Sequence, residues 1–183
     1  NYPPKHWDVK EGDKNDKVTS FSRPYRCVYI GALSLKNTFI REFCEWVMDL
    51  GGKIQFDIFS TNIHGDTKEY LKNIKSPYIN FMPQGVDYYK LPFLLKCYDV
   101  GLILYKCNTL NYTFNKPNKL FEYLYCNLDV WFPLEMKGMR KLIRSDRLPK
   151  ILSLDFKNLN QYDVDQLVSR DEFAQQKYDL YCE

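Results

Sequence analysis

The feature that most constrains this chain is a regular alternation of short apolar runs with segments of helical periodicity. The first run, Cys27–Ile30, ends at Gly31 and is followed by apolar residues at helical spacing from Phe39 to Leu50. The same order then recurs along the chain, for about six units in all. Strands that alternate with helices in this way predict an α/β fold built on a parallel, doubly wound sheet with right-handed crossovers.

The expected fold is a Rossmann-like doubly wound parallel sheet of about six strands with helices on both faces. Strands are expected at 27–30, 54–59, 78–82, 100–105, 130–132 and 151–154, and helices at 39–50, 67–74, 91–98, 118–126 and 136–143, with a last helix opening at Ser169. Asp66, with Glu69 three residues later, predicts a capping-box start for the second helix. The stretch from Lys106 to Pro117 is expected to be a loop of about a dozen residues, which is longer than most connections in a compact domain and therefore either functional or disordered. Ligands of such sheets bind at the carboxyl ends of the strands.

Length and composition indicate one domain without a nucleic-acid partner. The 183 residues are 45% apolar, and the net charge of +3 is spread along the chain rather than massed in one tail. Six cysteines without a Cys-x-x-Cys pair predict free thiols in a reducing cytoplasm. Residues 1–25 are expected to form a linker or arm and residues 26–183 the domain. The start without Met suggests a piece of a longer protein, and no apolar run has the ~20 residues of a membrane span.

The most informative segment is Lys116-Pro-Asn-Lys-Leu-Phe-Glu-Tyr-Leu124, which opens the helix after the long loop. Exposed backbone N–H groups at a helix start, with Lys116 and Lys119 beside them, form a natural anion site that suits pyrophosphate. Glu122, about one turn into the helix, is placed to accept hydrogen bonds from a diol such as a ribose. The alternative is that Asn118 only caps the helix and Glu122 is a solvated carboxylate. Both interpretations remain open on the residues alone.

This segment resembles the Pro-Asn-Lys-Leu-Phe-Glu-Tyr element of GT-B glycosyltransferases of the family 4 kind. Further matches are Tyr29-Ile-Gly-Ala-Leu33, Ile79-Asn-Phe-Met-Pro-Gln-Gly85 and Tyr98-Asp-Val-Gly-Leu102. Asn1-Tyr-Pro3 is similar to the junction at which such enzymes pass from acceptor domain to donor domain. The resemblance covers nearly the whole chain. It implies that residues 26–183 are a nucleotide-sugar donor-binding domain whose N-terminal acceptor domain is absent from this chain.

The resemblance also implies roles for individual residues. Glu122 would hold the donor ribose, and Gly31 would let the backbone approach the phosphates. The helix start would bind the diphosphate through Asn118, Lys119 and Leu120, with Lys36 as a second cation. Ser60 and Gln84-Gly85 would border the base, and the stretch from Thr113 to Lys116 would face the sugar. Family 4 enzymes retain the anomeric configuration, so the same outcome is implied here.

Three positions depart from the family pattern. Ala32 stands where many members carry Arg, which leaves only Lys36 for the second cation. Phe114 stands where the pattern has a second acidic residue, and Asn127 where it has a glycine. These departures motivate one of the alternatives below.

The favoured function is transfer of a sugar from a nucleotide diphosphate sugar to a glycan or lipid-linked acceptor. The acceptor site and any general base would belong to the missing half, so the domain alone is expected to be inactive and its catalytic residues stay unknown. No metal or other cofactor is expected, because ligand spacing is absent and the helix start with its lysines would stabilise the leaving diphosphate. The two histidines, His6 and His64, show no catalytic pattern.

Three other interpretations remain. A nucleotide-sugar epimerase shares the two-domain architecture, a degenerate binding domain would explain the three departures, and a flavodoxin- or receiver-like domain would share the fold alone. A late basic cluster forms either a solvated face or a peripheral contact with an anionic membrane at its cytoplasmic face. Its members are Arg140, Lys141, Arg144, Arg147 and Lys150.

Overall fold

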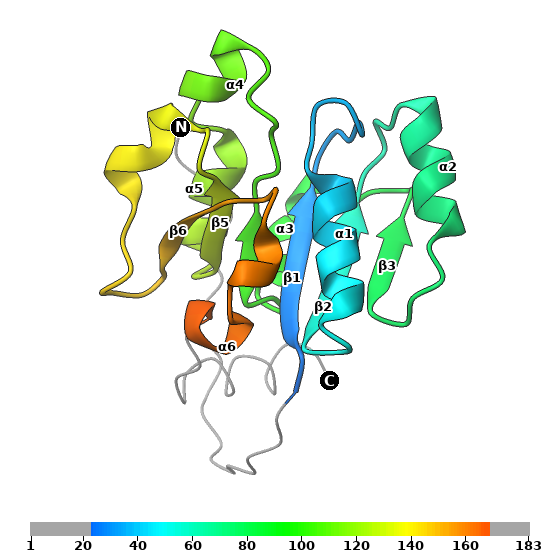
Figure 1. Cartoon of the computed structure of the whole chain (residues 1–183), viewed down its shortest axis with the longest axis horizontal. Coiled ribbons are helices and arrows are strands. Elements are labelled where there is room, and N and C mark those ends of the chain that lie inside the picture. Colours follow the sequence, from blue (N-terminus) through cyan, green and yellow to red (C-terminus); the bar gives the residue numbers. More distant parts are fainter. Residues whose placement is uncertain (1–22, 169–183) are drawn as a thin grey trace.

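A computed structural model describes residues 23–168 and contains one six-stranded sheet with all strands parallel (Figure 1). The strands are β1 (Tyr25–Ile30), β2 (Ile54–Phe59), β3 (Ile79–Met82), β4 (Val100–Leu102), β5 (Asp129–Pro133) and β6 (Ile151–Leu154). They lie in the order β3-β2-β1-β4-β5-β6, with every neighbouring pair parallel. This order confirms the Rossmann-like prediction. It also places the topological switch point between β1 and β4, where such sheets bind ligands.

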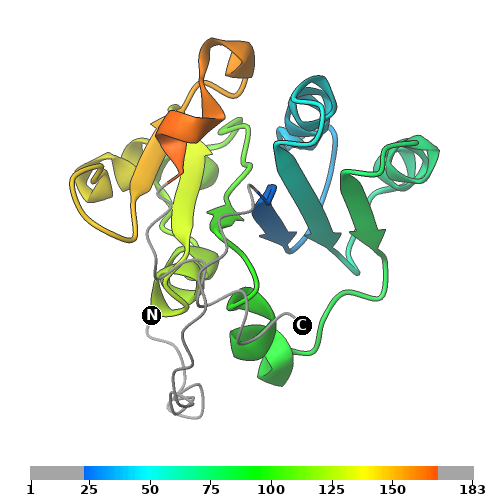
Figure 2. The same cartoon turned by 90° about the horizontal axis from the view of Figure 1, so that it is seen from below.

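Helices cover both faces of the sheet (Figure 2). The α-helices are α1 (Ile40–Asp49), α2 (Gly65–Asn73), α3 (Leu91–Leu95), α4 (Leu110–Phe114), α5 (Asn118–Tyr125) and α6 (Val164–Leu167). The 3₁₀ helices are η2 (Tyr88–Lys90), η3 (Lys137–Leu142) and η4 (Leu159–Gln161). One apolar core joins α1, η4 and α6 to the sheet, and a second joins α3, α5 and η3 to its other face. The two α-helical layers therefore enclose strands that are buried on both sides.

The local sequence explains the central elements. In α1 the buried residues Ile40, Phe43, Cys44 and Val47 recur at helical spacing, so one stripe faces the sheet. All five residues of β5 are buried, as expected for an inner strand covered on both faces. Gly101 in β4 leaves room for the ring of Tyr123, because a Cβ at this glycine would lie 2.2 Å from that ring.

Several boundaries differ from the sequence prediction. The stretch from Lys106 to Pro117 is not only a loop, because Thr109 caps the short helix α4 by accepting a hydrogen bond from the Tyr112 N–H. The expected capping box at Asp66 is wrong, since α2 begins at Gly65 with His64 as its N-cap. The helix expected at 136–143 is the 3₁₀ helix η3. β4 is only three residues long and ends at Leu102, three residues before the predicted end.

The cysteine prediction holds for four residues. Cys27, Cys44, Cys107 and Cys126 are free thiols, whereas Cys97 is disulfide-bonded, so the expectation of free thiols is wrong for Cys97. Between residues 23 and 168 no helix is long and apolar enough to cross a membrane. The helix expected from Ser169 and the arm up to residue 22 lie outside the described residues.

Candidate functional site

The carboxyl end of β1 meets the first turn of α5 through two residues, Gly31 and Lys119. Gly31 has a φ of +139°, a backbone conformation that glycine adopts without strain. A Cβ built on Gly31 would lie 2.9 Å from the Lys119 Nζ, so the ammonium group rests directly over the glycine. The sequence placed both residues in one anion site, and the structure brings them together at the switch point of the sheet.

Aromatic rings surround the Lys119 ammonium group. Its Nζ lies 4.2 Å from the ring centroid of Tyr29 and 5.2 Å from that of Tyr105. Within the described part of the chain no ion pair or hydrogen bond joins this ammonium group to another residue. Burial lowers the pKa of Lys119 to about 8, and the nearby Glu122 carboxylate opposes this change only in part. A cation held by ring faces and lacking a carboxylate on its ammonium group is ready to receive an anion.

Glu122 lies on the same side of α5, one turn after Lys119. Partial burial raises the pKa of Glu122 above its ordinary value, and the charge of Lys119 acts against that rise. Tyr88, in η2 after β3, lies near enough for Glu122 to raise its pKa as well, after a larger effect of desolvation. No hydrogen bond to the Glu122 side chain occurs among residues 23–168. The Glu122 carboxylate therefore has no hydrogen-bond partner in this part of the chain.

The packing of α5 fixes the position of this pair. Tyr123 is fully buried against Gly101, and its hydroxyl oxygen accepts a hydrogen bond from the Ile30 N–H at 3.3 Å. Leu120 is also fully buried in the core beneath α5. Its side chain cannot face a ligand, and its backbone N–H already donates a hydrogen bond to the Pro117 carbonyl oxygen at 3.0 Å, so the structure gives Leu120 no group for the predicted donor contact. The helix start is thus anchored from below by two buried side chains.

The other predicted site residues take different places. Asn118 is the first residue of α5, with Pro117 at the N-cap position, so Asn118 is not the helix cap. Lys36 is exposed in the loop after β1. Gly85 has a φ of +65° and lies against Thr61, so the residues that follow β2 and β3 meet there, and their role at the base stays a prediction.

The three departures from the family pattern are structurally distinct. Ala32 is exposed beside Gly31, and Phe114 is an exposed side chain on α4. Asn127 has a φ of +60°, the left-handed conformation in which a helix often ends with glycine. The Asn127 and Leu128 N–H groups donate to the Leu124 and Tyr123 carbonyl oxygens, the pattern of a Schellman cap. Asparagine therefore keeps the turn that glycine would make.

Sequence reasoning missed the rings that hold Lys119. Tyr29 is next to last in the first apolar run, Tyr105 ends the fourth, and Tyr123 lies beside Glu122 in the helix. These tyrosines were interpreted as packing residues, which is correct for their burial but incomplete for Tyr29 and Tyr105. The available signal was their position, because residues at the carboxyl ends of adjacent parallel strands lie at the ligand edge.

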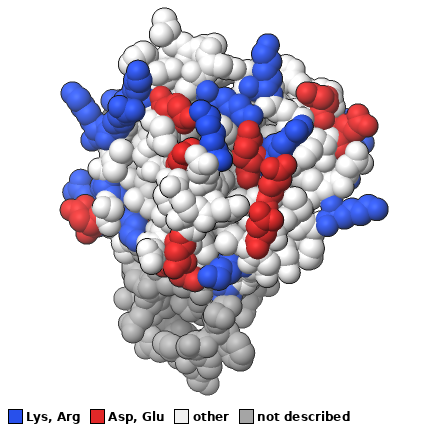
Figure 3. Space-filling model, viewed as in Figure 1, with Lys and Arg blue, Asp and Glu red and all other residues white. Residues whose placement is uncertain are grey.

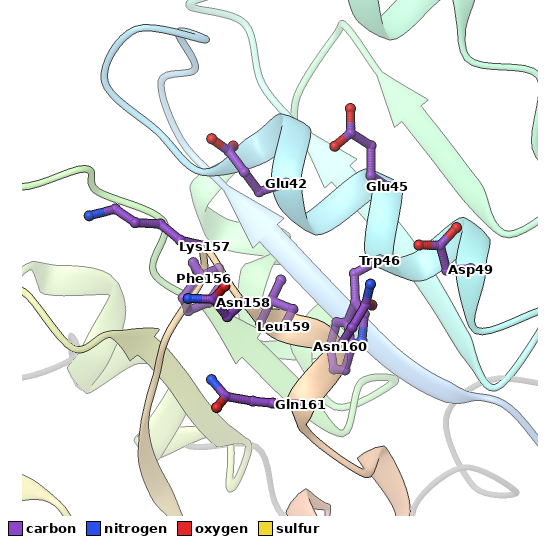
Figure 4. Close-up of a pocket in the computed structure, with 10 residues that line it drawn as sticks. All are labelled: Glu42, Glu45, Trp46, Asp49, Phe156, Lys157, Asn158, Leu159, Asn160 and Gln161. Carbon is purple, nitrogen blue, oxygen red and sulfur yellow. The ribbon is translucent and has the colours of Figure 1, made fainter.

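A separate groove lies between α1 and η4, on the face of the sheet opposite to α5 (Figure 4). Its volume is about 410 Å³. Glu42, Glu45 and Asp49 line one wall along α1, and Asn158, Asn160 and Gln161 belong to the other wall. None of the predicted site residues lines this groove. No group of three or more His, Cys, Asp or Glu side chains arranged to hold a metal ion is present in residues 23–168.

Comparison of the sequence with protein-family models gives no match, and comparison with curated proteins gives none either. Comparison of the structure finds the crystal structure of the C-terminal domain of a glycosyl transferase group 1 family protein, LpcC, from Francisella tularensis. The likeness has a TM-score of 0.54 at 15% sequence identity and covers 86% of this chain and 85% of that domain. Both the strand order and this likeness support the same conclusion. The chain has the Rossmann-like fold of the C-terminal domain of a group 1 glycosyl transferase.

Proposed function

We propose that this chain is the donor-binding domain of a GT-B glycosyltransferase, which binds a nucleotide diphosphate sugar. The observation that carries the proposal is the Lys119 ammonium group over Gly31, held by tyrosine rings and without a carboxylate partner among the described residues. A charge of this kind costs free energy until an anion pairs with it. Its place at the switch point of the sheet is where dinucleotides and related ligands bind in this class of fold.

In the proposed complex the diphosphate lies at the start of α5. The Lys119 ammonium group and the backbone N–H groups of the first helical turn face the phosphate oxygens, and Gly31 lets the backbone approach them. Glu122 accepts hydrogen bonds from the ribose hydroxyls. As the bond to the sugar breaks, charge grows on the diphosphate, and the same groups stabilise it without a metal ion.

Turnover requires an acceptor-binding half in addition to this domain. We propose that, when joined to that half, the domain transfers the sugar to a glycan or lipid-linked acceptor, with any general base supplied from the other side of the cleft. The domain alone is then expected to bind donor without transferring sugar. We also propose a cytoplasmic location, which the four free thiols favour and the disulfide at Cys97 opposes.

The direct test is calorimetric titration of this chain with UDP, GDP and ADP, without added metal and again with Mg²⁺. Saturable binding of one nucleotide is expected, weakened by about 1–3 kcal/mol in Glu122→Gln because a charged hydrogen-bond partner is lost. Glu69→Gln, which changes an exposed carboxylate on α2, is the matched control and should leave the affinity unchanged. Binding that is equal in both variants would contradict the role of Glu122.

Absence of binding by all three nucleotides calls for the same titration on the protein joined to its acceptor half. Binding regained there would mean that the two halves share the site. Absence of binding there too would refute the proposal and favour a degenerate domain, in line with the exposed Ala32 and Phe114.

A further inference from the structure

A second surface of the molecule combines exposed apolar and basic side chains. Its centre is α4, where Leu110 is 79% exposed and Phe114 is 57% exposed. α4 projects from the carboxyl edge of the sheet, and its last residue contacts η3, because a Cβ on Gly138 would lie 2.1 Å from the Phe114 carbonyl oxygen (Figure 1). We call the exposed residues of α4 and η3, together with the neighbouring Leu134, the α4–η3 surface.

The basic residues of this surface lie on η3. Lys137, Arg140 and Lys141 are all exposed. The Arg140 Nη2 donates to the Leu134 carbonyl oxygen at 3.4 Å, which holds a guanidinium group beside a leucine that is itself 38% exposed. Figure 3 shows white side chains over the top of the molecule, where α4 lies, and blue side chains beside them over η3.

The structure divides the basic cluster noted in the sequence. Arg144 and Lys150 are half-buried and donate to the carbonyl oxygens of Pro149 and Leu167, so they serve the fold. Arg140, Lys141 and Arg147 remain exposed. The segment from residue 106 to residue 150 contains nine Lys and Arg against four Asp and Glu, whereas the whole chain carries only +3. Of those four acids, Asp129 is buried and Glu135 is paired with Lys157, so the region presents mainly positive charge.

We infer that the α4–η3 surface docks on an anionic lipid bilayer, with Leu110 and Phe114 entering the interface and the η3 cations facing lipid phosphates. Exposed apolar side chains flanked by lysine and arginine are the pattern of peripheral membrane segments. A purely acidic protein partner would use the cations but would leave Leu110 and Phe114 in water. This inference does not depend on nucleotide binding. If both proposals hold, the Gly31 and Lys119 site opens beside the bilayer, where a lipid-linked acceptor would lie.

The test is co-sedimentation of the full chain with vesicles, using phosphatidylcholine mixed with phosphatidylglycerol and, separately, phosphatidylcholine alone. The chain should bind the anionic vesicles and not the neutral ones. Leu110→Ser with Phe114→Ser should weaken binding on the order of tenfold, because apolar area is lost from the interface. Lys137→Gln with Arg140→Gln and Lys141→Gln should weaken it about fivefold for each charge removed.

Matched controls come from other faces of the molecule. Phe93→Ser removes an aromatic ring with the same 57% exposure as Phe114, but on α3. Lys68→Gln with Lys72→Gln and Lys75→Gln removes three exposed lysines in and after α2. Neither control should change vesicle binding, and urea unfolding and nucleotide titration of each variant show whether folding or the donor site has changed.

Three results would overturn the inference. The first is absence of binding to anionic vesicles at low salt. The second is equal loss in the surface variants and their controls. The third is loss in the basic triple variant without loss in the Leu110 and Phe114 variant, which would indicate unspecific adsorption or an acidic partner. Failure of nucleotide binding with intact vesicle binding would refute the donor-site proposal alone.

Discussion

The base and the tip of the segment from Tyr105 to Glu122 are opposite kinds of surface. At the base, Lys119 and Glu122 are charged groups drawn into partly buried positions among tyrosine rings. At the tip, Leu110 and Phe114 are apolar groups held out in solvent. Each arrangement costs free energy in the free domain, because buried charge and exposed apolar area are both unfavourable. Together they indicate two separate partners, an anion at the base and an apolar, anionic surface at the tip.

Substitutions at the base should lower the free energy of unfolding strongly, and substitutions at the tip should not. Tyr123→Ala removes a fully buried ring that fills the space over Gly101, so we expect a loss of about 3–5 kcal/mol in the free energy of unfolding. Phe114→Ala removes an exposed ring, with an expected change within about 0.5 kcal/mol. Urea unfolding of both variants provides the measurement. Similar losses of unfolding free energy in the two variants would mean that α4 is part of the core. The contrast between base and tip would then be wrong.

The buried charge of Lys119 should lower the free energy of unfolding of the domain, although the same charge serves the proposed anion site. Its pKa is about 8 in the folded chain against an ordinary 10.5, so between these values the unfolded chain binds more protons. Stability contributed by this group therefore rises as the pH increases from about 8 to 10.5, and below about 8 the charged form imposes its full cost. Lys119→Met should raise the free energy of unfolding at pH 7 on the order of 1 kcal/mol and remove that rise with pH.

The measurement is urea unfolding at a series of pH values between 7 and 9.5, roughly the accessible part of that window. Lys116→Met changes an exposed lysine next to the same helix and should alter neither the stability nor its slope. A slope that Lys119→Met leaves unchanged would show that the ammonium group is not buried in the folded chain. Nucleotide affinity should also fall as the pH rises through about 8, since the neutral amine no longer attracts phosphate.

The elements of the fold could be predicted because each strand is an apolar run and most helices carry a stripe of matching period. β2 and β6 begin and end where expected, and β1 differs at one boundary only. α4 was missed because its five residues leave Leu110 and Phe114 exposed, so burial imposes no pattern on the sequence. The position of η3 was predicted to within one residue at each end but its type was not, since so short a segment fits an α-helix and a 3₁₀ helix about equally.

The site could be predicted in part. Gly31, Lys119 and Glu122 follow from strand ends, the helix start and the resemblance, and they lie together in the structure. The placement of Lys119 between the rings of Tyr29 and Tyr105 depends on a contact between Lys119 and Tyr29, which lie ninety residues apart in the sequence, and periodicity does not encode such a contact. Lys36 was named from its match to the family pattern, and its exposed position in the loop after β1 depends on a loop path that the resemblance does not determine.

The smallest expected effect lies at the joint between base and tip, the stacked rings of Tyr105 and Tyr112. Their centroids are 4.8 Å apart and their planes 18° apart, and this contact ties α4 to the end of the fourth strand unit. Tyr112→Leu should destabilise α4 by about 0.5–1.5 kcal/mol, because a stacked pair contributes that much beyond its buried area. Native-state hydrogen exchange at the Thr113 and Asn115 amides, which donate within α4, should then speed up by a factor of about 2–10.

Amides of β1 and β5 should be unaffected, and Tyr112→Phe, which keeps the stack, should behave like the unchanged chain. Faster exchange throughout the sheet would show that the tip and the base unfold as one unit, and the two regions would then have to be interpreted as a single site.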